Sequence, residues 1–172
     1  SMPELPNGYL IDSAVDKPSP LLGEGAFGVT YRVKKADGSG PFALKVVKME
    51  KHAGETEEEL TNLKIVNECV FFCQVLETHT LPNQQKQNCI VMELLTGSDI
   101  QHLIKEARTN GRRLGDARML SWLQQIALGL EFLQSKRLVH RDLHSGNVMV
   151  RPSDGAIKIL DLGLALTEEE AG

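Results

Sequence analysis

The sequence predicts an α+β protein of two lobes: a five-stranded antiparallel sheet with one helix, followed by a mainly helical region with a small strand pair. Three observations support this fold class. Short alternating or β-branched segments fill residues 21–47 and 73–95, a helical stripe runs through residues 116–136, and the character of the chain changes near residues 96–98. We therefore expect an N-terminal arm (1–20), an N-terminal lobe (21–96) and a partial C-terminal lobe (97–172).

The N-terminal lobe is predicted to begin as a meander of strands. Proline-rich residues 1–20 are expected to form a loose arm. Strands should flank the glycine segment 23–28, because the residues after it alternate and are β-branched. In the next strand, Leu44 would face one side and Ala43 and Lys45 the other. Segments 73–82 and 88–95 predict two further strands.

Helices are predicted at residues 54–68, 99–107 and 116–136. The first has an acidic first turn, which suits the helix dipole. The last carries an apolar stripe at helical spacing that would face the core, formed by Leu120, Leu123, Ile126, Ala127, Leu130 and Leu133. Short strands are expected at 138–139, 148–150 and 157–160.

The composition is that of an ordinary globular protein. The 172 residues are 41% hydrophobic and 24% charged, enough to bury a core without disulfide or metal support. The net charge of −4 provides no basic field, so we expect no nucleic-acid partner. No apolar run is long enough to span a bilayer, so we expect no membrane partner. Cys69, Cys73 and Cys89 lie in apolar segments and predict buried reduced thiols of an intracellular, cytoplasmic protein.

The segment GEGAFG matches G-x-G-x-x-G at Gly23, Gly25 and Gly28. In dinucleotide-binding folds the third glycine starts a helix, whereas strand-forming residues follow it here. Glycines allow backbone amides to approach phosphate groups without obstruction by side chains. The loop is therefore predicted to link two strands and to cover phosphates, with a plain hairpin turn as the alternative.

Lys45 shares its predicted strand face with apolar residues. A cation in such surroundings needs an anionic partner or a charged ligand, and a solvent-facing edge lysine is the alternative. Glu59 shares a helix face with Leu63 and Val66 and is the carboxylate expected to point inward. Glu68 stays open as a second candidate.

The stretch LVHRDLHSGNVMV, residues 138–150, places polar residues between two apolar flanks. Polar groups in a loop between buried strands are typical of functional sites, although a single loop aspartate is usually a turn former. Asp142 and Asn147 can converge on a metal or a substrate hydroxyl, and Asp161 adds a further oxygen ligand after a strand. Asn147 with Asp161 is the sparse oxygen set that Mg²⁺ adopts when phosphate completes its coordination.

In this order, the glycine loop, strand lysine, helix glutamate, HRDLHSGN and DLG resemble the eukaryotic-type protein kinase family, from about Leu21 onward. The resemblance implies ATP and Mg²⁺ as cofactors and transfer of the γ-phosphate to a protein hydroxyl, of serine or threonine. It implies a protein substrate and allows a regulatory protein partner. Asp142 would accept or orient the hydroxyl proton, Lys45 would pair with Glu59 and hold phosphates, and Asn147 and Asp161 would hold Mg²⁺.

The resemblance also implies a nucleotide site. Met92 would lie behind the adenine, the backbone of Glu93 and Leu95 would bond it, and Asp99 would reach the ribose. The full implied set is Gly23, Gly25, Gly28, Thr30, Ala43, Lys45, Met92, Glu93, Leu95, Asp99 and Met149, in which Ala43 and Met149 enclose the ring.

His144 stands where serine/threonine-directed members usually carry lysine. We expect it to assist transfer only when its imidazole is protonated, so that activity falls as the pH rises. His140 is implied to pack beneath the DLG segment rather than to act as a base. No APE motif follows DLG, so we expect a catalytic domain truncated after that segment, with a proteolysed fragment or a genuinely minimal version as the alternatives.

Two alternative functions are weighed against a protein kinase. One is a catalytically weak nucleotide-binding regulatory module, which retention of Lys45, Asp142, Asn147 and Asp161 argues against. The other is a small-molecule kinase, whose loops resemble DLHSGN but which lacks a well-formed glycine loop together with HRD.

Overall fold

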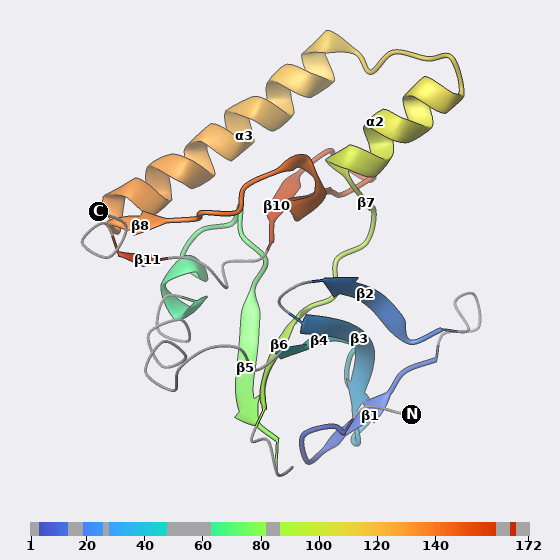
Figure 1. The fold of residues 1–172 in the computed structure, drawn as a ribbon, viewed down its shortest axis with the longest axis vertical. Coiled ribbons are helices and arrows are strands. Elements are labelled where there is room, and N and C mark those ends of the chain that lie inside the picture. Colours follow the sequence, from blue (N-terminus) through green and yellow to red (C-terminus); the bar gives the residue numbers. More distant parts are fainter. Residues whose placement is uncertain are drawn as a thin grey trace. The chain divides into compact units, whose positions relative to one another are not determined.

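The computed structural model describes residues 4–13, 19–25, 28–47, 63–81, 87–160 and 166–167 (Figure 1). The chain divides into two compact units, residues 1–53 with 74–94 and residues 54–73 with 95–172. The α+β class expected from the sequence is confirmed, with an antiparallel sheet in the first unit and helices in the second. No helix in the described ranges is long and apolar enough to cross a membrane.

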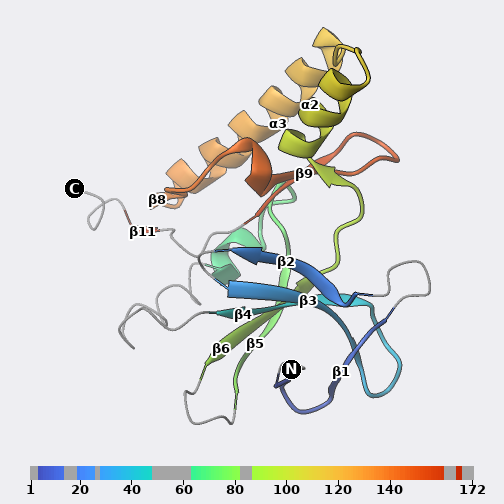
Figure 2. The same ribbon diagram turned by 45° about the vertical axis from the view of Figure 1, so that its right-hand side comes forward.

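The first unit is built on a six-stranded antiparallel sheet (Figure 2). Its strand order is β1-β3-β4-β6-β5, and β2 also pairs with β3. The strands are β1 (Tyr9–Ile11), β2 (Leu21–Gly25), β3 (Gly28–Lys35), β4 (Phe42–Val47), β5 (Val75–Thr80) and β6 (Asn88–Glu93). Five of these strands were expected. The sixth, β1, lies in the segment expected to be a loose arm, and it joins the sheet because Tyr9 is buried in the core and pairs with Lys35.

The hydrophobic core of this unit lies on one face of the sheet. Leu44 is fully buried in it and Phe42 and Val46 pack against it, whereas Lys45 follows Leu44 on the opposite face, as alternation predicts. The buried cluster contains Tyr9, Val33, Leu44, Leu81, Cys89 and Val91. All three cysteines are free and buried, as expected, and burial raises the pKa of the Cys89 thiol to about 11.

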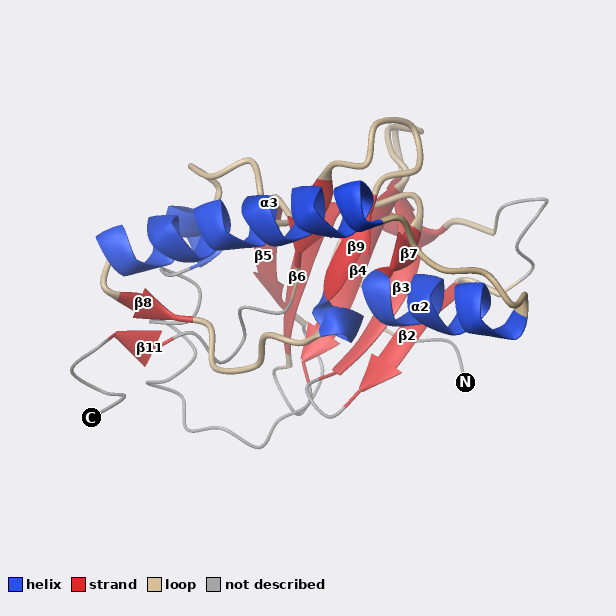
Figure 3. Cartoon of the chain, turned by 90° about the horizontal axis from the view of Figure 1, so that it is seen from above, coloured by secondary structure: helices blue, strands red, loops and turns tan. Residues whose placement is uncertain are grey.

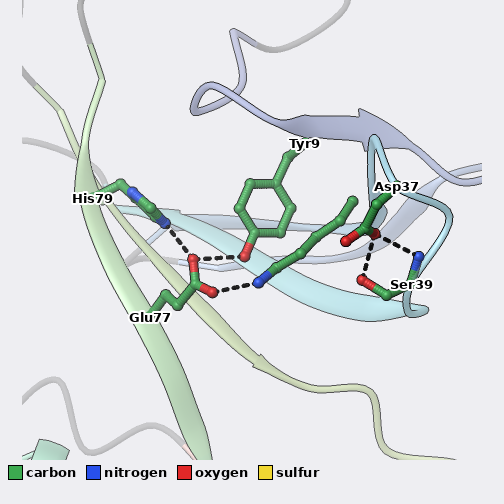
Figure 4. Close-up of polar contacts among 6 residues, drawn as sticks. Tyr9, Asp37, Ser39, Glu77 and His79 are labelled. Carbon is green, nitrogen blue, oxygen red and sulfur yellow. Dashed lines mark hydrogen bonds and ion pairs between the residues drawn. The ribbon is translucent and has the colours of Figure 1, made fainter.

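A polar network joins the edge strands β1 and β5 (Figure 4). Glu77 on β5 accepts hydrogen bonds from the Tyr9 hydroxyl at 2.8 Å and from Lys35 Nζ at 2.5 Å, and His79 Nε2 lies 3.0 Å from its carboxylate. The bond from Lys35, followed by that from Tyr9, lowers the pKa of Glu77 to about 2. Burial, reinforced by Glu77, raises the pKa of Tyr9 to about 12. The network therefore ties β1 into the unit.

The second unit contains α2 (Ile100–Thr109) and α3 (Asp116–Ser135), both close to their expected bounds. A three-stranded sheet has the order β10 (Ile157–Ile159), β9 (Val148–Val150) and β7 (Ser98–Asp99). Strand β8 (Leu138–Val139) pairs with β11 (Leu166–Thr167), as Figure 3 shows. Residues 63–66 are helical, and the rest of the expected helix before residue 63 lies outside the described residues.

The buried face of α3 differs from the predicted stripe. Trp122 and Gly129 are buried together with Leu133, whereas Leu120 and Leu123 are 65% and 62% exposed. A Cβ on Gly129 would lie 2.9 Å from Ile159 Cδ1 of β10, so the helix makes its close approach through a glycine. The stripe prediction was therefore wrong for Leu120, Leu123, Ala127 and Leu130, which are all exposed. Apolar residues surround much of this helix, and periodicity alone cannot choose the packed face.

Candidate functional site

The face of the first unit's sheet opposite its core carries four of the residues expected to bind a nucleotide. In the register of β3, β4 and β6, Thr30 and Ile90 lie opposite Lys45, and Met92 lies opposite Ala43. Residues directly opposite one another in an antiparallel sheet project from the same face. Thr30, Ala43, Lys45 and Met92 therefore share one surface, on which Lys45 is only 9% exposed.

Of the two carboxylates expected as partners of Lys45, the structure describes only Glu68. Glu59 lies outside the described residues. Glu68 forms an ion pair with Lys136, with 2.6 Å between Nζ and Oε2, and its side chain is 59% exposed.

The glycine segment forms the hairpin between β2 and β3. Gly25 pairs with Gly28, Gly23 pairs with Thr30, and the two residues at the tip lie outside the described ranges. The third glycine begins a strand rather than a helix, as predicted. A Cβ on Gly28 would clash with the Val46 carbonyl oxygen of β4, whereas nothing lies within 4 Å of a Cβ on Gly23 or Gly25. The sheet thus requires only the third glycine, and packing does not explain the other two.

The segment after β6 was expected to contact adenine and ribose. The Glu93 backbone N–H donates to the Gln74 carbonyl at 3.0 Å, so a backbone contact of Glu93 with a ligand would be made by its carbonyl oxygen. Leu95 is half-buried. Asp99 caps α2, since its Oδ1 accepts from His102 N at 2.7 Å, and it pairs across strands with Met149 of β9. The structure therefore places Asp99 and Met149 side by side.

Gly97 in this segment was missed as a structurally required residue. Its φ is +116°, and a Cβ at this position would clash with the Val150 carbonyl oxygen. Only glycine combines this dihedral with such a close approach. The sequence shows a glycine near the junction but not the strand that lies against it.

The loop between β8 and β9 is anchored by His140, which is 3% exposed. Its Nε2 lies 2.8 Å from the Leu160 carbonyl oxygen, and its Nδ1 accepts from Asp142 N at 3.3 Å. Nε2 must therefore carry the proton and Nδ1 must be bare. Both ring nitrogens bind backbone, which supports the expected packing role and not that of a base.

Asn147 holds Asp142. The Asn147 Nδ2 donates to the backbone oxygen and to Oδ2 of Asp142, each at 3.0 Å. Asn147 is 7% exposed, its N–H donates to His144 O, and its carbonyl accepts from Leu160 N at 2.8 Å. These contacts orient the Asp142 carboxylate, whose side chain remains 33% exposed. They also occupy the nitrogen of the Asn147 amide and leave its oxygen as the group suited to a hard cation.

His144 lies beside this pair. Its Nδ1 accepts from Gly146 N at 3.1 Å, its Nε2 is 3.7 Å from Asp142 Oδ2, and the side chain is 53% exposed. Protonation of Nδ1 would remove the bond from Gly146, so a charged His144 requires a change in this turn. Gln101 of α2, which sequence reasoning missed, lies against the turn: a Cβ on Gly146 would be 2.9 Å from its Oε1.

Asp161, the other expected metal ligand, lies just beyond the described range that ends at Leu160. Within the described ranges, no group of three or more His, Cys, Asp or Glu side chains could hold a metal ion. An ion at Asn147 would thus need oxygen atoms from Asp161 or from a bound phosphate.

The sequence is similar to those of known proteins. The sequence model of the family described as "Protein kinase domain" matches residues 17–171. Serine/threonine-protein kinase Nek11 of Mus musculus is 26% identical over 148 residues, which are 84% of this chain and 23% of that protein. Serine/threonine-protein kinase Nek10 of Mus musculus is 28% identical over 160 residues, 87% of this chain and 14% of that protein. Protein kinase C-like 1 of Caenorhabditis elegans is 28% identical over 153 residues, 86% and 21% respectively. The chain spans less than a quarter of the length of these relatives.

Proposed function

The chain belongs to the protein kinase family, and on this basis we propose that it transfers the γ-phosphate of ATP to a serine or threonine hydroxyl of a protein. The observation that carries the proposal is the loop in which Asn147 and His140 together fix Asp142. A carboxylate oriented by hydrogen bonds yet partly exposed is suited to accept a proton from an incoming hydroxyl.

Asp142 is the residue that meets the acceptor. The Asn147 amide binds its Oδ2 at 3.0 Å, so the carboxylate is oriented before a substrate arrives. An oriented carboxylate lowers the barrier by positioning the hydroxyl and accepting its proton as the oxygen attacks phosphorus. His144, 3.7 Å from the same oxygen, can support the developing negative charge when it is protonated.

The first unit supplies phosphate and base contacts. Lys45 offers a buried ammonium that suits the α- and β-phosphates, and the exposed backbone of Gly23 and Gly25 suits the approach of phosphate to amides. Ala43 and Met92 offer apolar surface on the same sheet face for the adenine ring.

The Asn147 side chain fits a magnesium ion that is completed by Asp161 and phosphate oxygens. The Asn147 amide oxygen is a hard ligand on a loop whose backbone is bonded to Leu160, the residue before Asp161. When bound with ATP, Mg²⁺ would neutralise charge on the phosphate oxygens. Glu59 remains the proposed partner of Lys45, and Asp99 with Met149 the proposed ribose and adenine neighbours.

Transfer of labelled phosphate from Mg-ATP to generic protein acceptors tests the proposal. Asp142→Asn should lower the rate by at least about a hundredfold while ATP binding persists, since the loss concerns the proton and the orientation of the hydroxyl. Asp154→Asn is the matched control, because Asp154 is an exposed aspartate of the same unit whose hydrogen bonds, among the described residues, are with neighbouring Arg151 and Ala156. Equal rates for Asp142→Asn and Asp154→Asn would contradict the proposed role.

A further inference from the structure

Five cationic side chains gather where α2 leads into α3, a region that we call the basic corner: Lys105, Arg108, Arg112, Arg113 and Arg118. All five are exposed. Figure 2 shows the loop that joins the end of α2 to the start of α3. Residues 100–118 contain only two acidic side chains, so this stretch carries a net +3 although the whole chain carries −4, and the remainder carries −7.

Among the described residues, the basic corner gathers cations without partners in one stretch, whereas Lys64 and Arg137 lie singly elsewhere and several other cations are paired. Arg32, Lys35, Lys136 and Arg151 each bind a carboxylate. In the part of the chain that the structure describes, no ion pair or side-chain hydrogen bond is made by any of the corner's five cations. Five cationic groups therefore remain available to an external anion.

The backbone under the corner is well defined by hydrogen bonds. Arg112 N donates to Ala107 O at 2.8 Å, and Gly111 N donates to Arg108 O at 3.1 Å. These bonds close the end of α2 and fix the backbone of Arg112, the first of the two loop arginines. A fixed backbone reduces the entropy lost when the side chains bind a ligand.

Two of the five charges conflict with local helix preferences, whereas Arg108 in the last turn of α2 suits them. Arg113 and Arg118 flank the start of the 20-residue helix α3, where the first turn carries Asp116 and the N-cap Gly115 provides no side-chain cap. Cations are unfavourable at this positive end of a helix dipole. A conflict of this kind is typical of functional surfaces, because an external anion offsets the repulsion.

We propose that the basic corner docks an acidic segment, rich in Asp and Glu, of a partner protein. Guanidinium groups match carboxylates through paired N–H···O bonds. Nucleic acid fits less well, because residues 100–118 contain no Phe, Tyr or Trp side chain for base stacking. A membrane fits less well because Leu114, the apolar residue of the loop, is half-buried. Docking of this kind does not depend on phosphoryl transfer.

Fluorescence anisotropy of a labelled twelve-residue Asp/Glu peptide, without ATP, tests this interaction on the full chain. Arg112→Gln with Arg113→Gln should weaken binding about tenfold, and binding should also weaken as salt is raised. The matched control neutralises Lys64 and Arg137, exposed cations of the same unit outside the corner, and should bind like the unchanged protein. Arg112→Lys with Arg113→Lys keeps the charge and should give an intermediate loss. Thermal unfolding of each variant verifies folding.

Three results would overturn the proposal. One is no binding of the acidic peptide by the unchanged protein. Another is equal weakening in the corner and control variants, since net charge alone would then explain the affinity. The third is tighter binding of an RNA oligonucleotide or of phosphatidylserine vesicles than of the peptide. Failure of phosphate transfer would leave all three measurements unaffected, so the two proposals are tested separately.

Discussion

Replacement of Asn147 by aspartate separates two roles of this side chain. A residue that only offers oxygen to a metal would work as well, or better, as a carboxylate. In the structure, however, the Asn147 nitrogen donates to both the backbone oxygen and Oδ2 of Asp142, each at 3.0 Å. Asn147→Asp exchanges that donor for an oxygen and places two carboxylates against one another.

The magnitude follows from these two bonds. A neutral hydrogen bond contributes about 1 kcal/mol and one to a charged group about 1.5–3 kcal/mol, toward the lower value here because Asp142 is partly exposed. Asn147→Ala should therefore lower the free energy of unfolding by about 2 kcal/mol. Asn147→Asp adds carboxylate repulsion and should lower it by about 3 kcal/mol at pH 7.5. The difference should shrink at pH 4.5, since a protonated carboxyl can again donate to Asp142.

Urea unfolding followed by Trp122 fluorescence measures this change without any activity assay. Trp122 is the single tryptophan, is buried, and lies in the same unit as Asn147. If Asn147→Asp is as stable as the unchanged protein at pH 7.5, the Nδ2 bonds do not orient Asp142 and the reasoning fails.

Two further predictions concern other parts of the chain. Tyr9→Phe should lower the free energy of unfolding by about 1 kcal/mol at pH 7 by far-UV circular dichroism in urea. The pKa of Glu77 is lowered to about 2, so the stability that the ionised carboxylate contributes is present above about pH 4.5 and is lost toward pH 2. The pKa of Tyr9 is raised to about 12, so the stability that the protonated hydroxyl contributes is present below about pH 10 and is lost as the pH rises toward 12. An unchanged difference at pH 2.5 would contradict this link. Gly97→Ala should lower the free energy of unfolding by about 3 kcal/mol, because φ is +116° and the added Cβ would meet the Val150 carbonyl oxygen. The control Gly111→Ala, at φ +62° in open space, should lower it by about 1 kcal/mol. Equal melting temperatures of the two variants would argue against the close approach at Gly97.

The sequence predicted the parts of the site that depend on local pattern. Strand alternation correctly separated Leu44 from Lys45, because a two-residue period assigns faces without knowledge of the neighbours. The glycine segment was correctly placed between strands, because the residues after Gly28 are strand formers. The order of the motifs was sufficient to identify the family.

The packed face of α3 and the place of β1 could not be predicted in the same way. Leu120 and Leu133 look equally suited to a core, yet Leu120 is 65% exposed and Leu133 is 1% exposed, because Gly129 sets the side on which β10 approaches. Tyr9 follows a proline-rich stretch, and its role depends on Glu77, which is distant in sequence.

Local periodicity and motif order by themselves determined the class of fold, the family and the side of the sheet that carries Lys45. Only the tertiary structure decided that Asn147 holds Asp142 through its amide nitrogen, that Gly97 admits the Val150 carbonyl, and that the arginines between α2 and α3 have no partners among the described residues. The reason is physical: alternation and helical spacing belong to one segment, whereas a hydrogen bond, a close approach or an unpaired charge depends on which distant segments come into contact.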